Sequence, residues 1–323
     1  MTPRELVSST TLSEVDTDRA FTVRVPASTS NLGAGFDAVG MAVARWLSVT
    51  ARVRPGGGPV TINRAGTLMQ IGCPYGDDLI WRGFIAACVA LRRSPPDGVE
   101  IDATSDIPVA RGLGSSASAI VAGALLANAM FDGRLDDAAI IDIAASSERH
   151  PDNVAPAVLG GAVLSVRTTG HHYRSVPLAV HPSLRFVFVV PDFEVRTAVA
   201  RAALPAQLDF TTAVGAAGRA AALIVGLQTA DEAILGVALD DLLHVPFRRS
   251  LVTGYDRVVD AAITAGAIGA TLSGSGSSIV AVLNDDSGDA VAAAAVRAWH
   301  AVGVAAESFT TSAEAAGATV EIA

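Results

Sequence analysis

One stretch of the chain decides the fold, Pro108-Val109-Ala110-Arg111-Gly112-Leu113-Gly114-Ser115-Ser116-Ala117-Ser118. The residues before it, 99–103, alternate as in a β-strand, and the residues after it predict a helix from 115 to 131. Gly112 and Gly114 allow the backbone to approach a ligand closely, and a helix start presents unpaired N–H groups and the positive end of its dipole. This strand, loop and helix suit a polyphosphate, although a glycine-serine turn with a serine N-cap would give the same pattern.

The residues on the N-terminal side of this stretch predict two strands and a helix. Strands are expected at 21–25 and 41–53, with a turn-rich stretch from Pro26 to Asp37 between them. A helix is expected at 80–91, with Asp77 or Asp78 as its N-cap.

The residues on the C-terminal side mix helices and strands. A helix at 136–147 ends at Glu148, and the region 197–265 is mainly helical, with breaks at Pro205 and Pro246. The remaining elements are strands at 161–167 and 185–190, two strands around a glycine turn within 270–283, a helix at 291–302 and a last strand at 319–322. Because strands and helices do not alternate strictly, the pattern favours the α+β class, and we expect a domain junction between about 165 and 190.

Composition excludes several classes of function. The 323 residues are half hydrophobic and carry a net charge of −9, so the chain offers no basic face to bind nucleic acid. Apolar runs such as 119–127 are shorter than the roughly 18 to 20 residues that cross a bilayer. The first twenty residues contain acidic side chains and no apolar run of the secretory type, so we expect a cytoplasmic protein.

Cysteine and lysine counts add two further exclusions. The two cysteines, Cys73 and Cys88, are too few for a disulfide framework and have no histidines at zinc spacing. All 23 basic residues other than histidine are arginines, so the chain has no lysine. Mechanisms that need the phosphate-loop lysine, the protein-kinase strand lysine or a Schiff base are therefore excluded.

Three further features are ambiguous when each is taken alone. Glu148 is either a solvated carboxylate at a helix end or a ligand for Mg²⁺, which prefers oxygen donors. His150 is either an ordinary hydrogen-bonded histidine or a catalytic group. The run Ser273-Gly274-Ser275-Gly276-Ser277 is either a hairpin turn or a segment beside a ligand.

Four segments together resemble, in order, the motifs of the GHMP kinase superfamily, and within it they are most similar to homoserine kinases. They are residues 26–37 followed by Gly40, 108–118, 150–156 followed by Gly160 and Gly161, and 272–276, and the resemblance runs from about 21 to about 310. It implies a two-domain α+β fold: an N-terminal domain like that of ribosomal protein S5 at 21–175, a C-terminal domain of ferredoxin-like type at 176–323, and a flexible segment at 1–20.

The resemblance assigns the cofactors. Residues Pro108 to Ser118 are expected to wrap the phosphates of ATP, and Ser116 and Glu148 to bind Mg²⁺. Two positions differ from many relatives: Arg149 stands where a glycine is usual, and Asp78 stands where asparagine commonly precedes the Leu-Ile pair.

The resemblance also assigns the substrate site, with L-homoserine as the substrate. Asn31, Asp37, His150, Asn153, Arg201 and Arg248 are the expected substrate residues, and Asn153 and Thr197 the expected catalytic residues. Asp37 suits the ammonium group, and the two arginines suit the carboxylate. In mevalonate-type relatives an aspartate stands in the place of Asn153, and an amide is no general base. We therefore expect direct attack by the substrate hydroxyl.

Alternative functions remain open at this stage. Another kinase of the superfamily, for mevalonate, shikimate or a sugar, would leave Asp37 without an ammonium partner. A non-catalytic relative that senses a ligand would be expected to lose Ser116 or Glu148, and both are present. Dimers are common in the family, so a homodimer is also implied.

Overall fold

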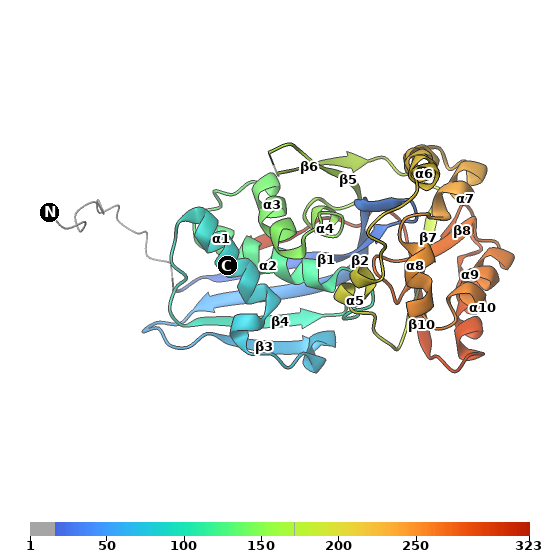
Figure 1. Cartoon of the computed structure of the whole chain (residues 1–323). Coiled ribbons are helices and arrows are strands. Elements are labelled where there is room, and N and C mark those ends of the chain that lie inside the picture. Colours follow the sequence, from blue (N-terminus) through green and yellow to red (C-terminus); the bar gives the residue numbers. More distant parts are fainter. Residues whose placement is uncertain (1–16, 171) are drawn as a thin grey trace.

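Two β-sheets form the frame of the molecule in the computed structural model, which describes residues 17–170 and 172–323 (Figure 1). Most of the segment 1–20 that was predicted to be flexible lies outside the described residues. Helices cover the sheets without strict alternation, so the predicted α+β class is confirmed.

The first sheet has seven strands, in the order β11-β1-β2-β4-β3, with β5 paired to β2 and β6 to β5. These strands are β1 Ala20–Asn31, β2 Gly35–Val53, β3 Thr61–Gly66, β4 Val99–Ser105, β5 Ala162–Arg167, β6 Tyr173–Leu178 and β11 Thr319–Ile322. The associated helices are α1 Leu79–Leu91, α2 Ser115–Met130, α3 Asp137–Glu148 and α4 Val154–Leu159. The core between them is rich in valine and alanine.

The stretch Pro26 to Asp37 is not the turn that its composition predicted. It continues β1 as far as Asn31, turns over only three residues, and enters β2 at Gly35. Antiparallel pairing carries the two strands past register shifts at Pro26/Ala27 and Ser30/Asn31. Pairing and burial therefore override the loop preference of the small polar residues, and Pro26 is tolerated because it stands at an irregularity.

The second sheet is antiparallel, in the order β10-β7-β9-β8. Its strands are β7 Arg185–Pro191, β8 Gly269–Leu272, β9 Ile279–Leu283 and β10 Ala306–Thr311, with helices α9 Tyr255–Thr264 and α10 Gly288–His300 against it. This is the strand order of a ferredoxin-like domain, as expected. Along β7, Phe186 and Phe188 face the first core, whereas Val187 and Val189 face the core beneath α9 and α10. One strand thus joins two apolar cores.

Four helices lie between β7 and β8: α5 Thr197–Ala202, α6 Phe210–Thr229, α7 Glu232–Leu239 and α8 Val245–Arg248. By length and composition α6 could cross a membrane, with a mean hydropathy of 1.5, which the sequence analysis did not anticipate. This is weak evidence for a span, because α6 also packs through Leu223 and Leu227 on the protein core, and its Arg219 pairs with Asp240.

The last strand, β11, was predicted in the C-terminal domain but pairs with a strand of the N-terminal domain. Residues of β11 pair with Phe21 to Arg24 of β1, so the C-terminal end of the chain belongs to the first sheet. The boundary predicted at 175/176 also falls inside β6. A division by sequence position alone therefore separates strands that are hydrogen-bonded to one another.

Candidate active site

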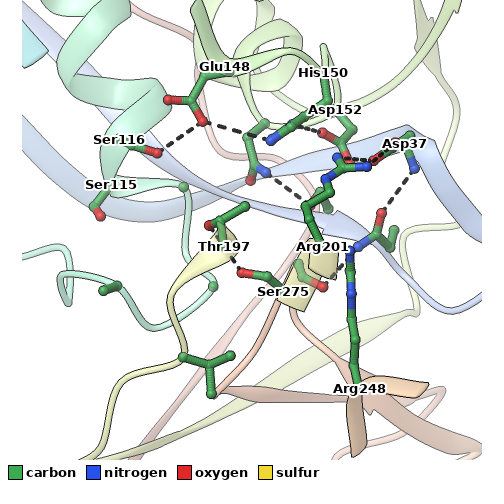
Figure 2. Close-up of a pocket in the computed structure, with 18 residues that line it drawn as sticks. Asp37, Ser115, Ser116, Glu148, His150, Asp152, Thr197, Arg201, Arg248 and Ser275 are labelled. Carbon is green, nitrogen blue, oxygen red and sulfur yellow. Dashed lines mark hydrogen bonds and ion pairs between the residues drawn. The ribbon is translucent and has the colours of Figure 1, made fainter. Parts of the chain in front are cut away.

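The four motifs meet around one cavity of about 60 Å³ between the two halves of the molecule (Figure 2). Hydroxyl and backbone groups join the segments: the hydroxyl oxygens of Thr29 and Ser273 are 2.9 Å apart, and Ser273 donates to the carbonyl of Gly112 at 2.7 Å. Gly274 N–H also donates to the carbonyl of Ser30. The glycine-serine run 273–277 is thus a wall of the site as well as a turn.

The glycines of the loop 108–118 are required by the protein itself. Gly112 and Gly114 have φ of 74° and 66°, and a Cβ on either would stand 2.1 Å from an oxygen of Ser273 or Ser28. The sequence interpretation had reserved this space for a ligand, but neighbouring protein segments occupy it. Gly114 caps α2 without a side-chain hydrogen bond, so the first turn at Ser115 and Ser116 presents free N–H groups at the cavity.

Other side chains of the loop face elsewhere. Leu113, Ala117 and Ser118 are buried in the core, and Ser118 donates to the carbonyl of Pro26. Arg111 donates to the carbonyls of Pro191 and Asp192 at 2.9 and 2.8 Å, so its guanidinium binds the end of β7 and the residue after it. The loop therefore offers its backbone and the start of α2 to phosphates. Its one cationic side chain, Arg111, holds the loop in place and does not face the phosphates.

A second, more apolar hollow of about 830 Å³ adjoins the same loop. Pro108, Val109 and Arg111 line it, whereas Ala110 and Gly112 line the first cavity. Met69 also lines this hollow. The loop thus separates a polar cavity from an apolar one.

Ser116 and Glu148 come together, as expected for shared metal ligands. The Ser116 hydroxyl donates to Glu148 Oε2 at 3.0 Å (Figure 2). Arg149, which follows α3, takes the left-handed φ of 71°, so the backbone keeps the conformation that a glycine would supply. The departure from the family pattern at Arg149 thus leaves Glu148 in place.

His150 stands between two carboxylates. Its Nδ1 is 2.6 Å from Asp152 Oδ1, and its Nε2 is 3.8 Å from Glu148 Oε2. Burial opposes the charged imidazolium, but the hydrogen bond and charge of Asp152 and the charge of Glu148 outweigh it and raise the pKa of His150. Burial raises the pKa of Glu148, with His150 and the Ser116 hydroxyl acting in the opposite direction. The sequence analysis included Asp152 in the motif 150–156 without assigning it a role.

The two asparagines are held by the protein. Asn31 donates to the carbonyl of Gly274 at 2.9 Å and accepts from the N–H of Asp37. Asn153 accepts from Ser28 and donates to Ser30, each at 3.0 Å. Both line the cavity. Their amides are therefore fixed in orientation before any ligand arrives.

The charged groups at the far side of the cavity are Asp37, Arg201 and Arg248 (Figure 2). The sequence interpretation put Asp37 and Arg201 at opposite ends of the substrate, but here they form an ion pair. Arg248 is only 2% exposed, and none of the described carboxylates lies within ion-pair distance of it. Burial and the nearby Arg201 lower the pKa of Arg248 to about 10, so it remains a cation near neutral pH.

Thr197 and Asp78 lie in different places relative to the cavity. Thr197 begins α5 and reaches the Ser275 hydroxyl at 3.4 Å, so it lies at the mouth of the cavity. Asp78 caps α1 by accepting from Ile80 N–H and pairs with Arg64 at 2.6 Å. Asp78 therefore has a structural role between β3 and α1.

Comparisons with known proteins show the family of the chain. The family described as GHMP kinases N terminal domain matches residues 78–161, and GHMP kinases C terminal matches residues 223–301. A homoserine kinase of Nostoc punctiforme is 36% identical over 93% of this chain and 97% of that protein. The homoserine kinase structure from Cytophaga hutchinsonii has a TM-score of 0.84 at 29% identity, covering 94% of this chain and 97% of its own. L. major mevalonate kinase, at 20% identity, 86% and 90% coverage and a TM-score of 0.65, shares the fold. The chain therefore belongs to the homoserine kinase family of the GHMP kinases.

Proposed function

We propose that this enzyme transfers the γ-phosphoryl group of ATP to the side-chain hydroxyl of L-homoserine, giving O-phospho-L-homoserine for threonine biosynthesis. One observation carries the substrate assignment: Arg248 is a buried cation without a carboxylate partner among the described residues, and it faces the same cavity as the carboxylate of Asp37. A buried unpaired charge is costly, and the carboxylate of an amino acid would neutralise it.

The ATP phosphates would lie against Gly112, Gly114 and the first turn of α2. The apolar hollow beside Val109 and Met69 would take the adenosine, because the loop places it next to the phosphate site. With no lysine in the chain, backbone N–H groups and the helix dipole supply the contacts that a lysine supplies elsewhere.

Ser116 and Glu148 are a fitting donor set for Mg²⁺. Among the described residues no cluster of three or more acidic, histidine or cysteine side chains could hold a metal, so a metal here would rely on few protein groups, Ser116 and Glu148. This suits an ion that takes one or two protein groups and completes its shell with phosphate oxygens and water. When bound, Mg²⁺ neutralises charge on the phosphates.

Transfer then depends on orientation. Asn153 keeps one free lone pair and one free N–H beyond its bonds to Ser28 and Ser30, enough to hold the attacking hydroxyl. Thr197, which lines the same cavity, would bind the substrate there. Positioned groups of this kind suit phosphoryl transfer, which asks for alignment and charge neutralisation more than for a strong base.

A substrate panel tests the proposal. ADP release is measured with L-homoserine, L-serine, mevalonate and shikimate at equal concentrations, and the product is identified by mass. We expect L-homoserine to be preferred strongly. Activity confined to mevalonate or shikimate would reject the amino-acid substrate, and a protein that binds ATP without turnover would support the non-catalytic alternative.

Localisation and assembly are separate proposals. We propose a cytoplasmic enzyme that works without nucleic acid or membrane, and the homodimer implied by the family stays a prediction. Fractionation of cells and sedimentation of the purified protein test these points directly.

A further inference from the structure

His244 is a fully buried histidine directly behind the substrate cavity. Its ring stacks on Phe36, with centroids 5.0 Å apart and 21° between the planes. Nε2 is 3.2 Å from the carbonyl oxygen of Gly33, and Nδ1 is 3.4 Å from Nη1 of Arg248. One imidazole thus touches the turn before Asp37 and the arginine that faces the cavity.

The two partners determine the state of the ring. A carbonyl oxygen can only accept a hydrogen bond and a guanidinium can only donate one, so both bonds exist only for a neutral imidazole with its proton on Nε2. Burial, opposed in part by the charge of Asp241, lowers the pKa of His244 to about 4. At neutral pH the ring is therefore an acceptor toward Arg248.

Few protein groups hold the guanidinium of Arg248. Its Nε donates to the carbonyl of Ala200 at 3.1 Å, and its plane lies near Phe36, 5.2 Å from the ring centroid. Its other hydrogen bond to a described residue is the one to His244. These two bonds leave three of the five N–H groups of an arginine for a ligand.

Asp241 fixes His244 in turn. Its Oδ2 accepts from the N–H groups of His244 and Val245, at 2.6 and 2.8 Å, and so secures the start of α8. Because His244 and Arg248 are four residues apart on this helical turn, their side chains lie on one face. The backbone thus brings imidazole and guanidinium together.

We propose that His244 is a positioning residue for substrate recognition, holding Arg248 through Nδ1 and the turn that leads to Asp37 through Nε2. The inference rests on the proposed function, in which Arg248 binds the substrate carboxylate and Asp37 the ammonium group. The neutral imidazole of His244 then sets the distance between Arg248 and Asp37, the two charged groups that bind the substrate.

Three variants separate the two ring nitrogens. His244→Phe keeps the stack on Phe36 and removes both hydrogen bonds. His244→Asn carries an amide oxygen near the position of Nδ1, and His244→Gln reaches the position of Nε2. Tyr255→Phe is the matched control, since Tyr255 is a buried polar aromatic residue in the second core, outside the cavity.

We expect His244→Phe to raise KM for L-homoserine about ten- to hundredfold, the range for losing a hydrogen bond to a charged group. The values of kcat and of KM for ATP should change little, and His244→Asn should recover more of the KM than His244→Gln. The preference for L-homoserine over 3-aminopropanol, which lacks the carboxylate, should shrink in His244→Phe and persist in Tyr255→Phe.

The outcomes separate the two proposals. A wild-type enzyme inactive on L-homoserine rejects the proposed function. An active wild type together with an unchanged KM in folded His244→Phe rejects the role of His244. If His244→Phe does not fold, the Asn and Gln variants decide, and equal KM values for wild type, Asn and Gln overturn the inference.

Discussion

Arg201 and Asp37 form a two-point ion pair, with Nη1 to Oδ2 and Nη2 to Oδ1 each at 2.6 Å. The two side chains come from α5 and from the start of β2, 164 positions apart. Burial alone would lower the pKa of Arg201, but the hydrogen bonds and charge of Asp37 outweigh it and raise the pKa. A bound amino acid would replace this ion pair by two others. The carboxylate of the amino acid would pair with arginine and its ammonium group with Asp37, so little electrostatic energy would be lost.

Removing the arginines should abolish carboxylate recognition. In the double variant Arg201→Ala and Arg248→Ala, the preference for L-homoserine over 3-aminopropanol in kcat/KM should nearly vanish. A single loss should cost about ten- to two-hundredfold, mainly in KM, because a charge-assisted hydrogen bond contributes roughly 1.5 to 3 kcal/mol. Arg219→Ala on α6 is the control. A double variant with the full wild-type preference would show that the carboxylate is read elsewhere.

Replacing Glu148 by Gln should weaken the binding of Mg²⁺. The change removes a negative charge beside the Ser116 hydroxyl, so more Mg²⁺ should be needed for half-maximal rate and kcat should fall. A titration of initial rate against Mg²⁺ at fixed ATP measures this, with Glu232→Gln on α7 as control. Identical Mg²⁺ curves for the variant and wild type would make Glu148 a structural carboxylate.

Replacing Asn153 by Ala should act mainly on kcat. In the proposed mechanism the Asn153 amide holds the substrate hydroxyl most strongly in the transition state, so we expect kcat to fall about a hundredfold with a smaller change in KM. Ser30→Ala, which frees one end of the amide, should cause a smaller loss. Steady-state kinetics on variants of verified melting temperature give the answer, and full kcat in Asn153→Ala would refute the geometry.

His244 should make the protein less stable in mild acid. Its folded pKa of about 4 lies below the ordinary 6.5, so between these values the unfolded chain binds more protons and stability falls as pH falls. The raised pKa of His150 contributes in the opposite sense, with stability lost as pH rises above 6.5. The free energy of unfolding, measured with urea at several pH values between 4 and 7, should depend on pH less steeply in His244→Phe than in wild type. The difference in slope should be up to about 1.4 kcal/mol per pH unit. Parallel slopes would contradict the depressed pKa.

Replacing Arg149 by Gly should relieve backbone strain without loss of function. Arg149 is exposed and has a φ of 71°, which costs a residue with a Cβ about 1 kcal/mol relative to glycine. We expect the free energy of unfolding to rise by up to that amount in urea denaturation, with kcat unchanged. A clear loss of stability would mean that the arginine side chain contributes contacts of its own.

The sequence predicted most of the buried elements and the exposed last strand, β11, but missed other strands at the sheet edges. Alternating residues marked the strand before the loop 108–118. Helix α2 was anticipated from the glycine-rich loop before it, because it is buried on nearly all sides and its apolar residues carry little helical periodicity. Helix α3 and the strands around 273–277 were also anticipated. Strands β3 and β10 were missed, since each is polar, partly exposed and at the edge of its sheet. Only pairing with a neighbour defines such strands, and pairing is not visible in a single segment.

For the site, residue types were easier to predict than their partners. The motif around His150 pointed to the cavity, and the neighbouring Asp152, two positions on, was the available signal for the carboxylate that holds it. The direction of the Arg111 side chain, toward the end of β7, had no local signal in the sequence. The pairing of Asp37 with Arg201 depends on how two distant elements pack, which neither segment encodes alone.

The return of β11 to β1 bears on how the protein is made. A ribosome releases β1 early and β11 after every other described element, so the first sheet stays one strand short throughout synthesis. Until then the backbone of Phe21 to Arg24 keeps an open edge that a second nascent chain could pair with. Truncation before Thr319 would make that exposure permanent, and its expected consequence is aggregation rather than a simple loss of catalytic rate.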